Sequence, residues 1–131
     1  IYLITISWGS HKDAKLALPE VSEDQYRPIS MNQFYRQFNK ENIIQIAAGC
    51  DHSAVLTGKS NNKFALIFDS NNLDKDKGHV YTWGFGQHGA LGLGHLENPT
   101  SPQRMRLDPA MGKITQLQCG ADLTFIRTEM L

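Results

Sequence analysis

Short runs of aliphatic, aromatic and β-branched residues alternate along the chain with glycine-rich and polar segments. The run at 80–83 combines Val, Tyr, Thr and Trp, which are residue types that favour a pleated, half-buried strand. Similar runs predict strands within residues 1–6, 43–49, 51–57, 114–120 and 122–128. The pattern therefore predicts an all-β chain.

The strand-like runs fall into two matched blocks. An offset of 75 residues places Trp8 on Trp83, and an offset of 71 residues places the runs at 43–57 on those at 114–128. The order of the runs is kept, and this self-similarity indicates an internal repeat. The chain is divided accordingly into a first, degenerate repeat at 1–57, an insertion at 58–77 and a well-formed second repeat at 78–131.

Glycine is concentrated directly after the second aligned tryptophan. Residues 84–94 contain five glycines in eleven positions, a density that permits left-handed backbone and close backbone contact. Leu91 and Leu93 stand between these glycines and are predicted to fill the core. Four further apolar residues are predicted to be buried in strands: Ile114, Leu117, Phe125 and Ile126.

The second block resembles a repeat of the RCC1 (regulator of chromosome condensation) family. The resemblance lies in a strand ending in Trp-Gly, in the segment 89–94 (GALGLG), in Pro102 and in the Cys-Gly pair at 119–120. Residues 49–57 are similar to the end of the preceding repeat. The residues of the structural repeat motif would then be Trp8, Gly9, Gly49, His52, Trp83, Gly84, Gly89, Leu91, Gly92 and Gly120.

The two blocks depart from the family pattern at different places. Ala14 and Ala17 stand where the family prefers glycine, so the first repeat is degenerate. In the second block, Leu123 stands where the family usually has the histidine that the first block keeps as His52. The resemblance implies that this histidine is structural and forms hydrogen bonds within its own blade.

The resemblance also implies a fold. The family forms a β-propeller of about seven four-stranded blades, so this chain would be a fragment of about two blades. Two repeats cannot bury their faces and close a ring alone, and the remaining blades of the same propeller are expected as partners. The chain starts with a strand-like run and without methionine, so we expect an internal part of a longer protein.

The insertion at 58–77 departs most from the family. It is rich in Asn, Lys, Asp and Ser around an apolar run, FALIF, at 64–68. Such a run is unfavourable as an isolated strand in water. It would either extend the strands of its own blade as a hairpin or meet another protein. The candidate protein-interaction residues are Phe64, Leu66, Phe68 and Lys75.

A second long connection, at 29–42, carries a helical pattern. Met31, Phe34, Tyr35 and Phe38 recur at the i, i+3, i+4 and i+7 positions of one helix face. This face would pack either on its own blade or on another protein.

The composition excludes several classes of function. The 131 residues are 40% hydrophobic and 20% charged, as in globular proteins, and the formal net charge is zero. Nucleic acid is therefore an improbable partner. No apolar run approaches the roughly 20 residues that span a bilayer, so no membrane partner is expected. Cys50 and Cys119 are expected as free thiols of an intracellular protein (cytoplasm, cytoskeleton or nucleus), with a disulfide as the alternative.

Each candidate motif of catalysis or cofactor binding lacks a residue or an element that its chemistry requires. The GxGxxG at 84–89 is followed by more glycine where a dinucleotide site needs a helix. Counted from Asn72, an EF-hand would need glycine and glutamate where Lys77 and Trp83 stand. The five histidines lack zinc-ligand spacing. We therefore expect no catalytic residue, no cofactor and no metal, and predict that the chain is not an enzyme.

The sequence thus predicts a non-catalytic protein-interaction or scaffolding module of a larger RCC1-repeat protein, such as a component of a large assembly. The resemblance leaves two alternatives. One is guanine-nucleotide exchange on a small GTPase. The other is a propeller appended to a catalytic domain, a ubiquitin ligase or a kinase, outside this chain. The expected partners are proteins, either a small GTPase or a large complex.

Overall fold

The computed structural model describes residues 5–18, 20–31, 34, 38, 41–58 and 78–130. The described part consists of strands, two short 3-10 helices and loops, which confirms the all-β prediction. The strands are β1 (Ile6–Gly9), β2 (Gln25–Ser30), β3 (Asn42–Ala48), β4 (His52–Gly58), β5 (His79–Gly84), β6 (Gln103–Arg104), β7 (Lys113–Cys119) and β8 (Thr124–Glu129). The 3-10 helices are η1 (Lys12–Ala14) and η5 (Pro109–Met111).

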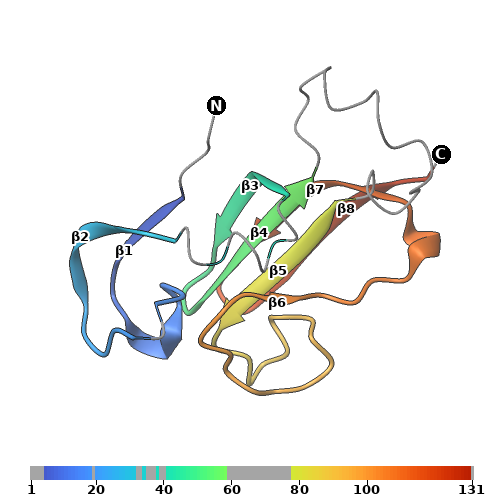
Figure 1. The fold of residues 1–131 in the computed structure, drawn as a ribbon. Coiled ribbons are helices and arrows are strands. Elements are labelled where there is room, and N and C mark those ends of the chain that lie inside the picture. Colours follow the sequence, from blue (N-terminus) through green and yellow to red (C-terminus); the bar gives the residue numbers. More distant parts are fainter. Residues whose placement is uncertain are drawn as a thin grey trace.

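These strands form three antiparallel sheets in chain order (Figure 1). The central sheet, β3-β4-β5-β6, is a complete four-stranded blade, and β1-β2 and β7-β8 are two-stranded. Under the repeat offsets, β1-β2 correspond to β5-β6, and β7-β8 correspond to β3-β4. The described chain therefore holds the second half of one blade, one whole blade and the first half of another.

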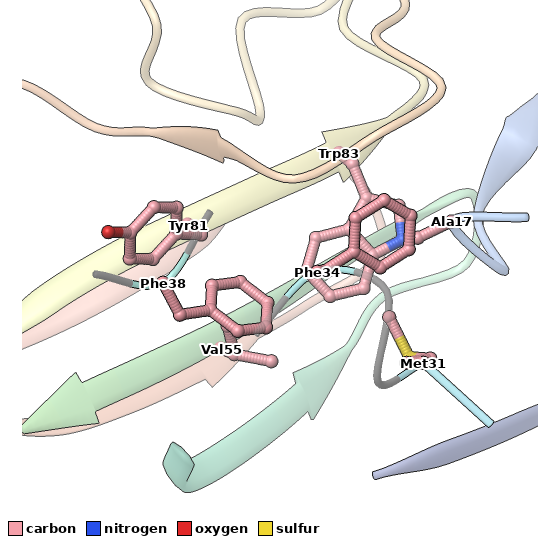
Figure 2. Close-up of a cluster of buried hydrophobic side chains, with 7 residues drawn as sticks. All are labelled: Ala17, Met31, Phe34, Phe38, Val55, Tyr81 and Trp83. Carbon is pink, nitrogen blue, oxygen red and sulfur yellow. The ribbon is translucent and has the colours of Figure 1, made fainter. Parts of the chain in front are cut away.

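The central blade buries both of its faces, because successive side chains of a strand point to opposite sides. Val55, Tyr81 and Trp83 face the β1-β2 side, whereas Ala54, Leu56 and Val80 face β7-β8. The first cluster, shown in Figure 2, consists of Ala17, Met31, Phe34, Phe38, Val55, Tyr81 and Trp83. The second consists of Ala54, Leu56, Val80, Met105, Ile114 and Leu117.

The connection between β2 and β3 packs on its own chain. The amide of Phe34 donates to the carbonyl of Met31 at 3.0 Å, and the amide of Phe38 donates to the carbonyl of Phe34 at 3.1 Å. All three side chains are buried, and the Phe38 ring meets Tyr81 edge to face at 5.0 Å between centroids. Of the two alternatives for this apolar face, the structure shows packing on the central blade. Tyr35 lies outside the described residues.

Two predictions about burial need correction. Leu91 is buried as predicted, but Leu93 is only half-buried. Phe125 is 63% exposed, although Ile126, its neighbour, packs against the second cluster. The reason is that, within the described residues, β7-β8 has a neighbouring sheet on one face only, and Phe125 points to the other face. Ile114 and Leu117 are buried as predicted.

Replacing Phe38 by alanine tests how far the central blade depends on this connection. The side chain is 3% exposed, so Phe38→Ala is expected to lower the free energy of unfolding by about 3–5 kcal/mol. Tyr26, on β2, is 91% exposed, so Tyr26→Ala should change the free energy of unfolding by less than about 0.5 kcal/mol. Urea unfolding of both variants measures the difference, and equal effects would contradict the packing described.

Candidate functional site: the blade junctions and the loop platform

The blades are joined by hydrogen bonds to one backbone carbonyl per repeat. The Lys15 carbonyl accepts from the Ser53 hydroxyl and from the Trp83 indole nitrogen, both at 2.9 Å. In the second repeat, the Thr124 hydroxyl donates to the carbonyl of Ala90 at 2.7 Å. Ala90 is the counterpart of Lys15, and Thr124 is the counterpart of Ser53. The hydrogen bond from a hydroxyl to this carbonyl is therefore formed in both repeats.

Two further hydrogen bonds recur within the half-blades. The Ser7 hydroxyl donates to the Leu16 carbonyl at 3.0 Å, as the Thr82 hydroxyl donates to the Leu91 carbonyl at 2.8 Å. The amide of Met31 donates to the Thr5 carbonyl at 2.8 Å, and the amide of Met105 donates to the Val80 carbonyl at the same distance. The first repeat thus keeps the geometry of the second, although its sequence is degenerate.

The alanines at glycine positions keep the glycine conformation. Ala14 and Ala17 have φ angles of 58° and 53°, and their counterparts Gly89 and Gly92 have φ angles of 75° and 62°. A left-handed backbone is unfavourable for residues that carry a Cβ atom. The first repeat therefore holds two strained residues where the second repeat uses glycine.

Gln45 connects the first strands of adjacent blades. Its side-chain amide donates to the Leu117 carbonyl at 2.6 Å and accepts from the Leu117 amide at 2.9 Å. One side chain of β3 thus satisfies both backbone groups of a residue on the edge of β7. Sequence reasoning missed this residue, although its counterpart Gln116 stands at the same position of the second repeat.

His52 lies in the junction between the central blade and β8. It is 2% exposed, and its Nε2 lies 3.1 Å from the Thr124 hydroxyl. Because that hydroxyl donates to Ala90, it accepts from His52, which places a proton on Nε2. The expectation that His52 bonds within its own blade is therefore wrong, since its partner lies in the next sheet.

The environment of His52 favours the neutral ring. Burial lowers its pKa, against a smaller opposite effect of a hydrogen bond with the Leu123 backbone and of the nearby carboxylates Asp122 and Asp51. Gly49 packs against the ring so closely that a Cβ atom there would overlap the imidazole and the Gly120 carbonyl. A bulkier or charged group has no room at this place.

The other predicted motif residues occupy two different environments. Trp83 is 3% exposed and hydrogen-bonded, whereas Trp8 is 57% exposed. Gly9 and Gly84 both have positive φ angles, of 112° and 104°. The candidate interaction residues of the insertion, Phe64, Leu66, Phe68 and Lys75, lie outside the described residues.

Four loops gather at one end of the sheets and form what we call the loop platform: residues 10–18 with 20–24, 49–51, 85–102 and 120–123 (Figure 1). Lys15 Nζ donates to the Cys50 carbonyl at 3.0 Å and to Asp51 Oδ1 at 3.1 Å. The amide of Phe85 donates to the Asp51 carbonyl at 2.8 Å. The amide of Cys50 donates to the Ala121 carbonyl at 3.4 Å. The hydrogen bond from Lys15 lowers the pKa of Asp51. Loops of all three sheets are thus fixed together.

The opposite end of the central blade carries a partly buried polar cluster at the base of the insertion. His79 Nδ1 lies 2.8 Å from Glu41 Oε2, and the Thr57 hydroxyl donates to the same oxygen at 2.5 Å. Glu41 therefore connects the end of β4 to the start of β5. This cluster fixes the two points, Gly58 and Gly78, between which the insertion runs.

The described residues contain no set of side chains arranged as the ligands of a metal ion. Among them, no group of three or more His, Cys, Asp or Glu side chains lies close enough to hold an ion. Cys50 and Cys119 are free thiols, and burial raises the pKa of Cys119. In the same part of the chain, no helix has the length and apolarity to cross a membrane.

Comparison with known proteins identifies the repeat. Residues 77–126 match the model of the regulator of chromosome condensation (RCC1) repeat. The mouse serine/threonine-protein kinase Nek9 is 33% identical over 115 residues, which are 88% of this chain and 9% of that protein. The human RCC1-like G exchanging factor-like protein is 30% identical over 108 residues, 82% of this chain and 18% of that protein.

Further similarity extends to a ligase and to a solved structure. The human E3 ubiquitin-protein ligase HERC2 is 30% identical over 117 residues, 88% of this chain and 2% of that protein. The crystal structure of human WBSCR16 aligns with 97% of this chain and 40% of its own, at 19% identity and a TM-score of 0.39. The chain spans less than a fifth of the length of these curated relatives.

The described structure defines a repeat protein with one four-stranded antiparallel blade between two two-stranded sheets, joined through the same backbone carbonyl in each repeat. The chain belongs to the RCC1 repeat family, with one repeat recognised at 77–126. The family prediction made from the sequence is thereby confirmed. Its blades are those of an RCC1-like β-propeller.

A pair of substitutions tests the left-handed positions. Nothing lies within 4 Å of a Cβ atom built at Gly89, so Gly89→Ala should cost only the backbone strain, about 1–2 kcal/mol. At the counterpart position, Ala14→Gly should instead raise the free energy of unfolding by up to about 1 kcal/mol. Urea unfolding measures both. A destabilised Ala14→Gly variant would show that the alanine is not strained.

His52 should make the stability of the protein depend on pH. Its pKa is lower in the folded chain than the unfolded value of 6.5, so the unfolded state binds more protons between the two values. The free energy of unfolding should therefore fall as pH decreases below about 7. His52→Gln should weaken this dependence, as measured by urea unfolding between pH 5 and pH 8. An unchanged slope would refute a buried neutral ring.

Proposed function

We propose that the chain is a non-catalytic protein-interaction and scaffolding module of a larger RCC1-repeat protein. The observation that carries this proposal is the loop platform, in which hydrogen bonds fix loops of three sheets against one another. A rigid surface made of several loops can bind a partner without first paying the entropy of ordering them. The free thiols support an intracellular location.

The chemistry of the platform suits a protein partner. Within the platform, Leu96 is 63% exposed and Leu123 is 43% exposed. The platform also carries the polar side chains of Lys12, His88 and Asp122. Apolar residues surrounded by polar ones are typical of protein interfaces. The relatives carry similar repeats in a kinase, an exchange factor-like protein and a ubiquitin ligase, which favours a shared binding role over a shared reaction.

The insertion is a second proposed contact. The two residues that flank it, Gly58 and Gly78, lie at the end of the central blade opposite to the platform. We propose its residues Phe64, Leu66, Phe68 and Lys75 as docking residues on the strength of their apolar and cationic character. Platform and insertion would give the module two separate binding surfaces.

Guanine-nucleotide exchange is the second candidate, favoured by the similarity to the RCC1-like G exchanging factor-like protein. In that case the platform would face a small GTPase. A propeller attached to a kinase or ubiquitin ligase domain is the third candidate, favoured by the similarity to Nek9 and HERC2. In that case the activity lies outside these residues.

A comparison of three variants tests the proposed function. Leu96→Glu alters the platform, and Met111→Glu alters an equally apolar residue, 51% exposed, on η5 away from it. A third variant lacks residues 59–77. Leu96→Glu should weaken partner recovery by about tenfold or more, and Met111→Glu should not. Equal recovery for all variants would contradict both surfaces.

A nucleotide-release assay separates the first two candidates. A scaffold should leave the release of fluorescent GDP from a panel of small GTPases unchanged. Faster GDP release from any of these GTPases would contradict the scaffold proposal and support nucleotide exchange. The GDP release rate with Leu96→Glu would then show whether the platform is the surface involved.

A further inference from the structure

Tyr26 is the most exposed large hydrophobic side chain that the structure describes. It is 91% exposed and stands at the second position of β2. Among the described residues, its ring and its hydroxyl have no aromatic or hydrogen-bond partner. A tyrosine usually contributes to a fold by burying its ring. Folding gains little from this one, and its phenol is presented to solvent.

The second repeat shows that this position is open in a blade with neighbours. The amides of Met31 and Met105 donate to equivalent backbone carbonyls, so the segment 26–31 falls on the segment 100–105. Tyr26 is thereby the counterpart of Thr100, which leads into β6 of the central blade. That blade packs against a sheet on each face, and Thr100 is nevertheless exposed. A sheet on each face therefore leaves this position accessible.

Tyr26 also lies on the rim of its blade. The counterpart of β2 is β6, which is the last strand of the complete central blade, so the free edge of β2 is an outer edge. An extended segment with a free edge can pair with a strand of another protein through its main chain. Pro28 offers no amide, which confines such pairing to the part of β2 that carries Tyr26. This part can enter the cleft of an enzyme without unfolding.

The charges around Tyr26 indicate the chemistry of such a cleft. Glu23 and Asp24 precede Tyr26 and are exposed, and Arg27 follows it. Asp24 Oδ1 accepts from the His11 amide at 2.8 Å, which fixes the acidic segment to the loop before it. A cleft that binds this segment needs basic side chains on the side that receives Glu23 and Asp24.

A passive docking role fits Tyr26 less well than modification does. Residues that dominate a protein interface lie at the centre of a patch that is desolvated on binding. The neighbours of Tyr26 on β2 are Gln25 and Arg27, which are polar, and the preceding segment is acidic. The arrangement is an accessible hydroxyl in a charged, extended segment, which suits an enzyme that modifies the hydroxyl.

We propose that Tyr26 is a phosphorylation site for a tyrosine kinase with a basic substrate cleft and with ATP as the phosphoryl donor. The phenolic oxygen of Tyr26 forms a bond to the γ-phosphorus of ATP, and the bond from that phosphorus to the bridging oxygen breaks. ADP leaves with the electron pair, and the phenolic proton passes to a carboxylate of the kinase. The inference is independent of the proposed function.

The modification would change the surface of the blade and preserve its fold. The phosphate adds about −1.5 to −2 charges at pH 7 and three acceptor oxygens to the rim. Because the Tyr26 ring has no packing or hydrogen-bond partner among the described residues, the phosphate displaces none of them. The circular dichroism spectrum of the phosphorylated chain should therefore equal that of the unmodified chain.

Phosphorylation of the folded chain in vitro tests the proposal. The chain is incubated with ATP, Mg²⁺ and the catalytic domains of tyrosine kinases that have basic substrate clefts, and mass spectrometry locates the phosphate. Tyr26 should react at least about tenfold faster than Tyr81, which is 2% exposed and reacts only after local unfolding. A synthetic peptide of residues 20–31 is the unfolded reference and should react within about tenfold of the folded chain.

A pair of charge reversals tests the proposed chemistry of the cleft. Glu23→Lys should slow the phosphorylation of Tyr26 by about tenfold, because it places like charges opposite each other. Glu129→Lys is the matched control, since Glu129 is an exposed acid on β8 and should leave the rate unchanged. Equal rates for the two variants overturn the basic cleft. A folded chain that takes up no phosphate on Tyr26, whether or not the peptide reacts, overturns the site itself.

Discussion

A partly buried backbone carbonyl at each blade junction is the constraint on which the rest of the structure depends. A carbonyl removed from water must find a donor, or the chain loses the free energy of a hydrogen bond. At Lys15 the donors are a hydroxyl on β4 and the indole of β5, and at Ala90 the donor is a hydroxyl on β8. These donors come from different strands. The need of each carbonyl for a donor therefore fixes the position of each sheet against the loop that precedes it.

Other features of the junction follow from this placement. Because the Thr124 hydroxyl already donates to a carbonyl, it needs a donor in turn, and His52 supplies one from a buried, neutral ring. The ring is accommodated only because Gly49 has no side chain. The left-handed backbone before each carbonyl aims it at its donors, which explains why Ala14 keeps that conformation at a cost in strain.

The junctions also connect architecture with binding. Fixing each sheet to the preceding loop brings the turns and loops of three sheets to one end, where Lys15 and Asp51 hold them together. The hydrogen bonds of the junctions therefore hold the loops in place, and the proposed binding role uses the surface that these loops form.

The sequence by itself determined the strands β3, β4, β5, β7 and β8, the internal repeat and the family, because these depend on local residue type and on a fixed spacing. It did not indicate β2 and β6, which lie in segments without a strand-like pattern. It also indicated the buried leucine of the glycine-rich segment, Leu91. Only the tertiary structure decided that a blade combines strands of two sequence repeats, that Phe125 is exposed, and that His52 bonds outside its blade. Contacts such as those of His52 and Gln45 join residues 72 positions apart. Nothing in the local sequence marks such partners, since each pairing exists only once the sheets stand side by side.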